Sequence, residues 1–362
     1  MKFQLDEPRP FKLVSPASVE DAVRLWNDNR GGAMYLAGGG DVADMVKRQL
    51  ARPALLIDLK NISSLHGIRP NFTAAKEPGF TLGALTTLRE VAEDDGIRRY
   101  LPALAMAASR VATPQIRNVG TVGGNLLQEN RCPYYRGEWN CYRKGGMHCY
   151  ADHGFNREHA IFEGDRCFVV SPSDLAPVIV AGNAIIHVHG PRGPRTIPAE
   201  ELYVRASQNL MRMHSLDKGE VLTAVEFRVR EPQPSQEFHV PGRGVRGSVS
   251  PLPLEQRFPS IFIKYAMRNA FDFALASVAV ILDRQGDGRR ASRCAIVLGA
   301  VAATPYRARD AERVVIGNQL TDEVIHEASQ AAARGAKPLE LNEYKVGLVK
   351  KLVAEALQEL RS

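Results

Sequence analysis

Three consecutive glycines, Gly38–Gly40, constrain the fold of this chain more than any other short stretch. In AMYLAGGGDVADMVKRQ an apolar, strand-like run precedes the glycines and a helical pattern follows them. The next stretch, PALLIDLKN, predicts another strand. A strand, a glycine turn, a helix and a strand in this order are typical of an α/β unit. Glycine allows positive φ angles and lets a phosphate approach backbone N–H groups at the start of a helix. The turn therefore predicts an anion site.

A second glycine stretch, RNVGTVGGNLL, offers the same chemistry further along the chain. Its candidate residues are Gly120, Thr121, Gly123, Gly124 and Asn125. Two loops that cradle anions suit the pyrophosphate of a dinucleotide. Neither loop has the Rossmann spacing or the lysine of a P-loop, so two tight turns are the alternative for each loop alone. Their joint presence favours a dinucleotide site.

Helix and strand patterns alternate through the first two thirds of the chain. SPASVEDAVRLWNDN predicts an amphipathic helix behind Ser18, with Asp21 as the capping partner. GFTLGALTTLREVAEDD predicts a strand and then a capped helix, and VIVAGNAIIHVHG and VLTAVEFRV predict strands. The sequence thus indicates mixed helix and sheet.

A change of texture at about residue 231 marks a domain boundary. The stretch 233–258 is dense in Pro, Gly, Ser and charge, which is typical of a linker or surface insertion. Beyond it, FALASVAVIL, SRCAIVLGAV and the helical pattern YKVGLVKKLVAEALQEL predict a second α+β unit. One apolar stripe of the last helix is expected to be core: Val349, Leu352, Val353, Ala356 and Leu360.

Composition limits the class of protein. The chain has 362 residues, 44% of them hydrophobic, and a formal charge of +7 spread among acidic residues, which speaks against nucleic acid as the partner. The start, MKFQLDEPRP, lacks the apolar stretch of a secretory signal, and no apolar run reaches the length of a membrane span. We therefore expect a soluble, cytoplasmic protein.

Four of the five cysteines are candidate metal ligands: Cys132, Cys141, Cys149 and Cys167. Their spacing fits neither a zinc ribbon nor the bacterial ferredoxin run, but four thiolates suffice for a four-iron cluster or a tetrahedral zinc ion. Four unrelated thiols are the alternative. The fifth cysteine, Cys294, is expected to be an ordinary core thiol. Nearby histidines at 148, 153 and 159 are within reach as ligands, although a histidine in a polar loop is more often solvated.

Several motifs together resemble one family, the FAD-binding middle subunit of the molybdenum hydroxylases. They are LAGGGD, TPQIRNVGTVGGNL, SPSDLAP, KYAMRNAFDFALASVAV and NEYKVGLVKKLV, and the resemblance spans nearly the whole chain. It implies an α+β protein: a two-part FAD-binding domain of the PCMH/VAO type over residues 1–232, then a smaller α+β domain over 259–362. The second domain would be of the CO dehydrogenase flavoprotein C-terminal type.

The same resemblance implies the residues that bind FAD. They are Leu36, Ala37, Gly38, Gly39, Gly40, Asp41, Val42, Thr113, Gly120, Thr121, Gly123, Gly124, Asn125, Asp174 and Lys264. Asp174 would accept hydrogen bonds from ribose or ribityl hydroxyls, the alternative being a helix cap. Lys264 would place its cation near the flavin ring, the alternative being a surface lysine. Gly40 departs from the family, which often has Thr there, and the insertion at 235–258 is longer than the family's.

A branch of the family carries an extra four-iron four-sulfur cluster between the second glycine loop and the acidic segment. NLLQENRCPYY, GFNREHA and CFVVSPSD are similar to the aldehyde oxidase version of this branch. The resemblance implies that the loop 131–168 binds such a 4Fe-4S cluster through Cys132, Cys141, Cys149 and Cys167.

The function that the resemblance implies is electron transfer inside a larger complex. Electrons from a large molybdenum-cofactor subunit would pass through a small 2Fe-2S subunit to FAD here, then to a small-molecule or protein acceptor. The complex would oxidise aldehydes or (hetero)aromatic compounds, and a partner with an export signal could carry it to the periplasm. Two alternatives stand beside this: a zinc-stabilised nucleic-acid-binding module and a stand-alone FAD oxidase.

Overall fold

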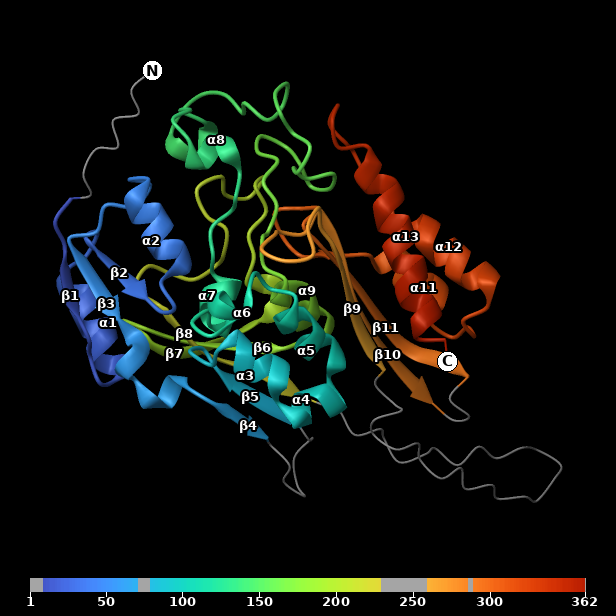
Figure 1. Cartoon of the computed structure of the whole chain (residues 1–362), viewed down its shortest axis with the longest axis horizontal. Coiled ribbons are helices and arrows are strands. Elements are labelled where there is room, and N and C mark those ends of the chain that lie inside the picture. The colour runs from blue at the N-terminus through green and yellow to red at the C-terminus, as the bar shows by residue number, and fades with distance from the viewer. Residues whose placement is uncertain (1–8, 71–78, 229–258, 286–288, 362) are drawn as a thin grey trace.

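A computed structural model describes residues 9–70, 79–228, 259–285 and 289–361, so the predicted linker 233–258 lies outside the described residues. Two groups of elements divide the described part (Figure 1): residues 9–228 form two sheets with their helices, and residues 259–361 form a third sheet with its own helices. The fold is α+β, as expected.

A small parallel sheet begins the chain. Its strands are β1 (Lys12–Val14), β2 (Ala33–Leu36) and β3 (Leu55–Asp58), in the order β1-β3-β2. The helix α1 (Val19–Asp28) starts behind Ser18, whose hydroxyl accepts a hydrogen bond from the N–H of Asp21 at 3.1 Å. The helix α2 (Gly40–Lys47) follows the glycine triplet. The strand, glycine turn, helix and strand predicted from this segment are all present.

A five-stranded antiparallel sheet forms the centre of the first group. Its order is β4 (Ile68–Pro70), β5 (Gly79–Gly83), β8 (Val221–Arg228), β6 (Ile185–Gly190) and β7 (Gly193–Pro198). The helices of this group that follow β5 in the chain are α3 (Leu88–Glu93), α4 (Asp95–Tyr100), α5 (Pro102–Ser109), α6 (Pro114–Arg117), α7 (Val122–Leu126) and α9 (Leu175–Ala181), of which α7 contacts β5 and β8 while α5 and α9 contact the C-terminal sheet. The capped helix predicted after GFTLG is α3, where Thr87 and Glu90 form a capping box.

One strand prediction was wrong in part. The first half of VIVAGNAIIHVHG belongs to α9, and only Ile185–Gly190 is a strand. Every residue of α9 is buried, so its apolar run has no polar face. A short run of this kind cannot be assigned from periodicity.

The third sheet is antiparallel and belongs to the C-terminal group. Its strands are β9 (Ser260–Tyr265), β10 (Ala276–Gln285), β11 (Arg290–Gly299) and β12 (Tyr306–Arg307), in the order β12-β11-β10-β9. The helices α11 (Arg309–Val315), α12 (Asp322–Ala332) and α13 (Tyr344–Glu359) lie on one side of it (Figure 1). The apolar stripe predicted in the last helix is buried, and Cys294 is a core thiol, as expected.

The cysteine segment runs between α7 and α9 and has little regular structure. It contains α8 (Pro133–Arg136) and one turn of 3-10 helix, Tyr142–Lys144. Elsewhere in the chain, 3-10 turns occur at Leu59–Asn61, Ser63–Leu65 and Ala199–Glu201. The C-terminal group holds this segment by its backbone. The amide of Asn342 donates to the carbonyls of Asn156 (3.3 Å), His159 (3.1 Å) and Ala160 (3.3 Å).

Candidate functional site

The two glycine loops open onto one cavity of about 1230 Å³. Its lining includes all but three of the residues expected to bind FAD: Ala37, Gly38, Gly39, Gly40, Asp41, Val42, Gly120, Thr121, Gly123, Gly124, Asn125 and Asp174. The other three, Leu36, Thr113 and Lys264, do not line it. Leu36 ends β2, and Thr113 caps α6 by accepting a hydrogen bond from the N–H of Ile116 at 3.3 Å.

The first glycine loop has a backbone that only glycine adopts readily. Gly39 precedes α2 with a φ of 84° and offers no side chain to cap it. A Cβ on Gly40 would meet no atom within 4 Å, so the backbone here faces open space. The N–H groups at the start of α2 are therefore accessible from the cavity, in an arrangement suited to phosphate.

The second glycine loop packs directly against the first. A Cβ on Gly38 would lie 2.2 Å from the carbonyl oxygen of Val119, so only glycine allows the two loops to approach this closely. Thr121 begins α7, and its hydroxyl accepts a hydrogen bond from the N–H of Gly124 at 3.0 Å. The hydroxyl that we expected to bind the cofactor thus has a capping contact within the loop.

Asp174 and Lys264 form a buried ion pair at the edge of this cavity. The Nζ of Lys264 lies 2.6 Å from the Oδ2 of Asp174, and each side chain is 6% exposed. Lys264 also donates to the carbonyls of Arg110 (3.1 Å) and Asp272 (2.9 Å). Burial raises the pKa of Asp174 to about 6, although the neighbouring ammonium group lowers it.

This pair excludes the structural alternative considered for each of its two members, a helix cap for Asp174 and a surface lysine for Lys264. The side chain of Asp174 does not cap α9, because the N–H of Ala176 donates to the hydroxyl of Ser173 instead. Lys264 is not a surface lysine. A neighbouring pair, Arg268 and Asp272, lies 3.7 Å apart outside any helix.

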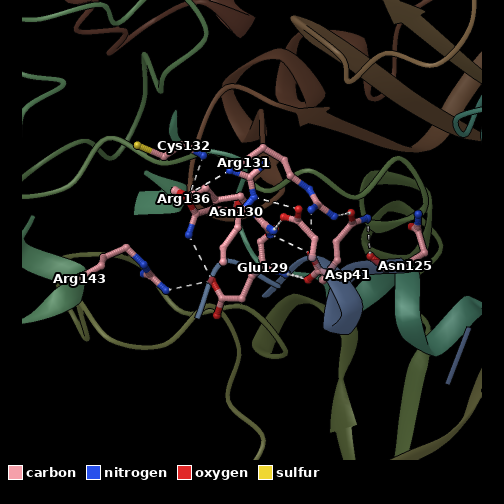
Figure 2. A network of polar contacts seen from close by, with 11 residues as sticks. Asp41, Asn125, Glu129, Asn130, Arg131, Cys132, Arg136 and Arg143 are labelled. Carbon is pink, nitrogen blue, oxygen red and sulfur yellow. Dashed lines mark hydrogen bonds and ion pairs between the residues drawn. The ribbon is translucent and has the colours of Figure 1, made fainter. Parts of the chain in front are cut away.

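Asp41, the residue after the glycine triplet, is held by three donors. Arg131 lies 2.7 Å and Arg136 2.8 Å from its Oδ1, and the N–H of Glu129 donates to its Oδ2 at 2.7 Å. Figure 2 shows these contacts, with Cys132 next to Arg131. The carboxylate thus joins the first glycine loop to the segment that begins the cysteine region.

Sequence reasoning missed a second group of residues that line the cavity. Among them are Trp26, Tyr35, Arg131, Met211, Arg212, His214, Lys218, Phe271 and Phe273. They come from distant segments, and none was singled out from the sequence, although Phe271, Phe273 and Arg131 lie within motifs that resemble the family. Tyr35 donates to the carbonyl of Gly219 at 2.8 Å, and burial lowers the pKa of His214 to about 4, so this imidazole is neutral at pH 7.

A second cavity is lined by all four candidate cysteines, together with His159 and Arg143. The backbone at Tyr134 and Tyr135 lowers the pKa of Cys132, and the backbone at Val169 lowers that of Cys167, in each case by less than burial raises it. Burial raises the pKa of Cys132 to about 12 and that of Cys167 to about 11. Four thiols that approach from distant parts of the segment therefore face one space.

Of the histidines near the cysteines, His159 was expected to be solvated, and this was wrong. It is 4% exposed, its Nε2 lies 3.3 Å from the sulfur of Cys132, and burial lowers its pKa to about 4. His148 and His153 are exposed. Within the described ranges, no three or more His, Cys, Asp or Glu residues are grouped closely enough to hold a single metal ion.

Family models cover most of the chain. Residues 9–227 match the FAD binding domain in molybdopterin dehydrogenase, and residues 261–360 match the CO dehydrogenase flavoprotein C-terminal domain. The chain belongs to the molybdopterin dehydrogenase FAD-binding family. It is an FAD-binding oxidoreductase subunit. The family therefore favours the molybdenum hydroxylase subunit over the two alternatives, the nucleic-acid-binding module and the stand-alone FAD oxidase.

Relatives in this family match along almost their whole length. The aldehyde oxidoreductase FAD-binding subunit PaoB of Escherichia coli (strain K12) is 28% identical over 337 residues, covering 91% of this chain and 92% of the relative. The carbon monoxide dehydrogenase medium chain of Hydrogenophaga pseudoflava is 28% identical over 357 residues, covering 97% and 96%. Both are named as parts of larger enzymes.

Solved structures agree with the fold. A carbon monoxide dehydrogenase structure from Hydrogenophaga pseudoflava superposes with a TM-score of 0.68 at 25% identity, covering 97% of each chain. A reconstituted CO dehydrogenase from Oligotropha carboxidovorans gives a TM-score of 0.71 at 23% identity, covering 98% of this chain and 99% of the other. Among the described residues, none of the helices has both the length and the apolar character needed to cross a membrane.

Proposed function

We propose that this chain is the electron-transferring medium subunit of a molybdenum hydroxylase that oxidises aldehydes or (hetero)aromatic compounds. Its partners are a large molybdenum-cofactor subunit and a small 2Fe-2S subunit. The electrons that it receives from them pass to a small-molecule or protein acceptor. The cavity shared by the two glycine loops carries this proposal. A flavin supplies exchange of one or two electrons.

The residues of the first cavity suit FAD in the way that its chemistry requires. The open backbone at Gly39 and Gly40 offers N–H donors to phosphate, and the second loop brings Gly123 and Gly124 to the same space. Lys264 donates hydrogen bonds to the carboxylate of Asp174 and to the carbonyl of Asp272. The residues of the two loops bind and orient the cofactor, and Lys264 holds Asp174 in place at the edge of the cavity, while the substrate is oxidised on the partner.

We further propose that Cys132, Cys141, Cys149 and Cys167 hold a 4Fe-4S cluster. The support is that all four line one cavity, since a cluster of this kind is held by four cysteine thiolates. A zinc ion requires four sulfurs about 2.3 Å from one point. Among the described residues no such group of side chains could hold a single metal ion, and a cluster spaces its ligands further apart than one ion does.

The test is anaerobic purification of the chain together with its partners, from the cytoplasm or, if a partner bears an export signal, from the periplasm. We expect one FAD per chain and, in the chain separated from its partners, about four irons with matching sulfide. The complex should oxidise aldehydes or aromatic heterocycles, and the separated chain should not. Zinc without iron would overturn the cluster, and turnover by the separated chain would overturn the subunit role.

A further inference from the structure

Arg131 stands between the two cavities of the molecule. It precedes Cys132, and its own side chain lines the cavity of the glycine loops. Its Nη1 lies 2.7 Å from Asp41, its Nη2 donates to Gln128 at 2.9 Å, and its guanidinium lies 5.0 Å from the ring centroid of Phe273. The side chain of Arg131 thus contacts the first glycine loop, the residues that follow α7 and the C-terminal group.

The charges around Arg131 are not balanced by the protein. Three guanidinium groups, those of Arg48, Arg131 and Arg136, share the two carboxylates of Asp41 and Asp44. Three positive charges against two negative charges leave one in excess. Arg136 is 7% exposed, and Arg48 is 49% exposed to solvent. Arg131, at 26%, is the member of this group that lines the cavity.

The other basic residues of this cavity's lining have different surroundings. Arg268 lies near Asp272 and donates to the carbonyl of Phe271, Arg212 donates to the carbonyl of Leu216, and Lys218 is exposed. Arg131 is the one that bonds to the residue directly after the glycine triplet. An anion on the triplet's N–H groups would meet this excess positive charge at short range.

We propose that Arg131 binds the diphosphate of FAD and, through its bond to the cysteine segment, makes FAD binding and the stability of the thiol site mutually dependent. This inference rests on the proposed function. The link to the thiols is short: Asn130 accepts a hydrogen bond from the N–H of Cys132 at 3.1 Å, and its carbonyl accepts one from Arg136 at 2.8 Å. Figure 2 shows this chain of contacts from Asp41 to Cys132.

The coupling follows from reciprocity. FAD held by Arg131 fixes the side chain, and with it the backbone that carries Cys132. A bound cluster fixes the same backbone and presents Arg131 to FAD already ordered. If one ligand favours the other, the second favours the first by the same factor.

The first test measures FAD dissociation constants in the full chain purified with its partners and stripped of flavin. Arg131→Met is expected to weaken FAD binding about ten- to a hundredfold, the loss typical of a hydrogen bond to a charged group. Arg131→Lys should recover most of it. The matched control is Arg307→Met, a partly buried arginine that pairs with Glu312 away from the cavity, and it should bind FAD like the unmodified protein.

Salt gives a readout that a purely structural role would not change. FAD affinity of the unmodified protein should fall between 50 and 300 mM NaCl, and Arg131→Met should lose part of that dependence. Should Arg131→Met not fold, Arg131→Gln carries the same comparison. Affinity within twofold of the unmodified protein in either variant, or an equal loss in Arg307→Met, overturns the inference and leaves the proposed function intact. Absence of FAD binding in the unmodified protein overturns both.

The second test follows iron release to a chelator with and without FAD. In the unmodified protein FAD should slow release at least about fivefold, the lower end of typical coupling between sites. In Arg131→Met the two rates should be equal. Equal rates in the unmodified protein would refute the coupling, and iron-free protein would refute it together with the cluster.

Discussion

The buried pair of Asp174 and Lys264 yields a quantitative prediction. Replacing Lys264 by Met leaves the carboxylate of Asp174 without its cation in a site where both side chains are 6% exposed. Breaking a buried pair in this way typically costs about 3–5 kcal/mol. The carboxyl group can limit that cost by taking up a proton, because burial already raises its pKa to about 6.

The pH dependence of this cost follows from the ordinary pKa of 3.8. Each pH unit above that value adds about 1.4 kcal/mol to the free energy of keeping Asp174 protonated in the folded state. At pH 8 protonating Asp174 thus costs about 6 kcal/mol, which exceeds the cost of the unpaired carboxylate, so the full loss of about 3–5 kcal/mol in unfolding free energy is expected. At pH 5 protonating it costs only about 1.6 kcal/mol. A folded pKa raised above the unfolded one means stability that is present at low pH and lost as the pH rises.

Urea unfolding of Lys264→Met at pH 5 and pH 8 measures this difference. The surface pair of Arg89 and Glu93 supplies the control, because both side chains are more than half exposed, and Arg89→Met should cost at most about 1 kcal/mol at either pH. Adding Asp174→Asn to Lys264→Met should restore most of the loss at pH 8. An equal loss at both pH values, or a loss below about 1 kcal/mol at pH 8, would refute the reasoning.

Three further predictions concern the loops, a buried lysine and the thiols. Gly38→Ala should lower FAD affinity at least tenfold by pushing the loops apart, a loss of about 1.4 kcal/mol or more. Gly347→Ala, where a Cβ would meet no atom and which lies outside the cavity lining, should bind FAD like the unmodified protein in the same titration. Burial lowers the pKa of Lys345 to about 7 from an ordinary value of 10.5, so the free energy of unfolding should rise with pH between these two values. Lys345→Met should flatten this rise in unfolding experiments, and an unchanged slope in the variant would contradict the prediction. Cys149→Ser should lose the iron that colorimetric assay detects, and Cys294→Ser should keep it; equal iron in both would exclude Cys149 as a ligand.

The elements that the sequence predicted well are those with a local signal. The amphipathic helix α1 has a serine cap and α13 has a clear apolar stripe, and both are present. The glycine triplet predicted a turn before a helix because glycine is needed at a φ of 84°. The helix α9 was misassigned because it is apolar on every side and too short for length to decide.

The site was predictable only as far as single residues carry a signal. Clusters of glycines or cysteines indicate a kind of site from the sequence alone. The pairing of Asp174 with Lys264, in contrast, joins residues 90 positions apart and depends on how β9 packs. A lysine of this kind has no local mark, since most lysines are exposed. Likewise, His159 lies in a polar stretch, and only the tertiary fold buries it against Cys132.

The most direct test of the central claim is a structure of the complex with FAD bound. The account predicts that the diphosphate of FAD lies within hydrogen-bond distance of the backbone N–H groups of Gly39 and Gly40, in the cavity that the two glycine loops share. Flavin density outside this cavity, or a diphosphate held by side chains remote from both loops, would contradict it.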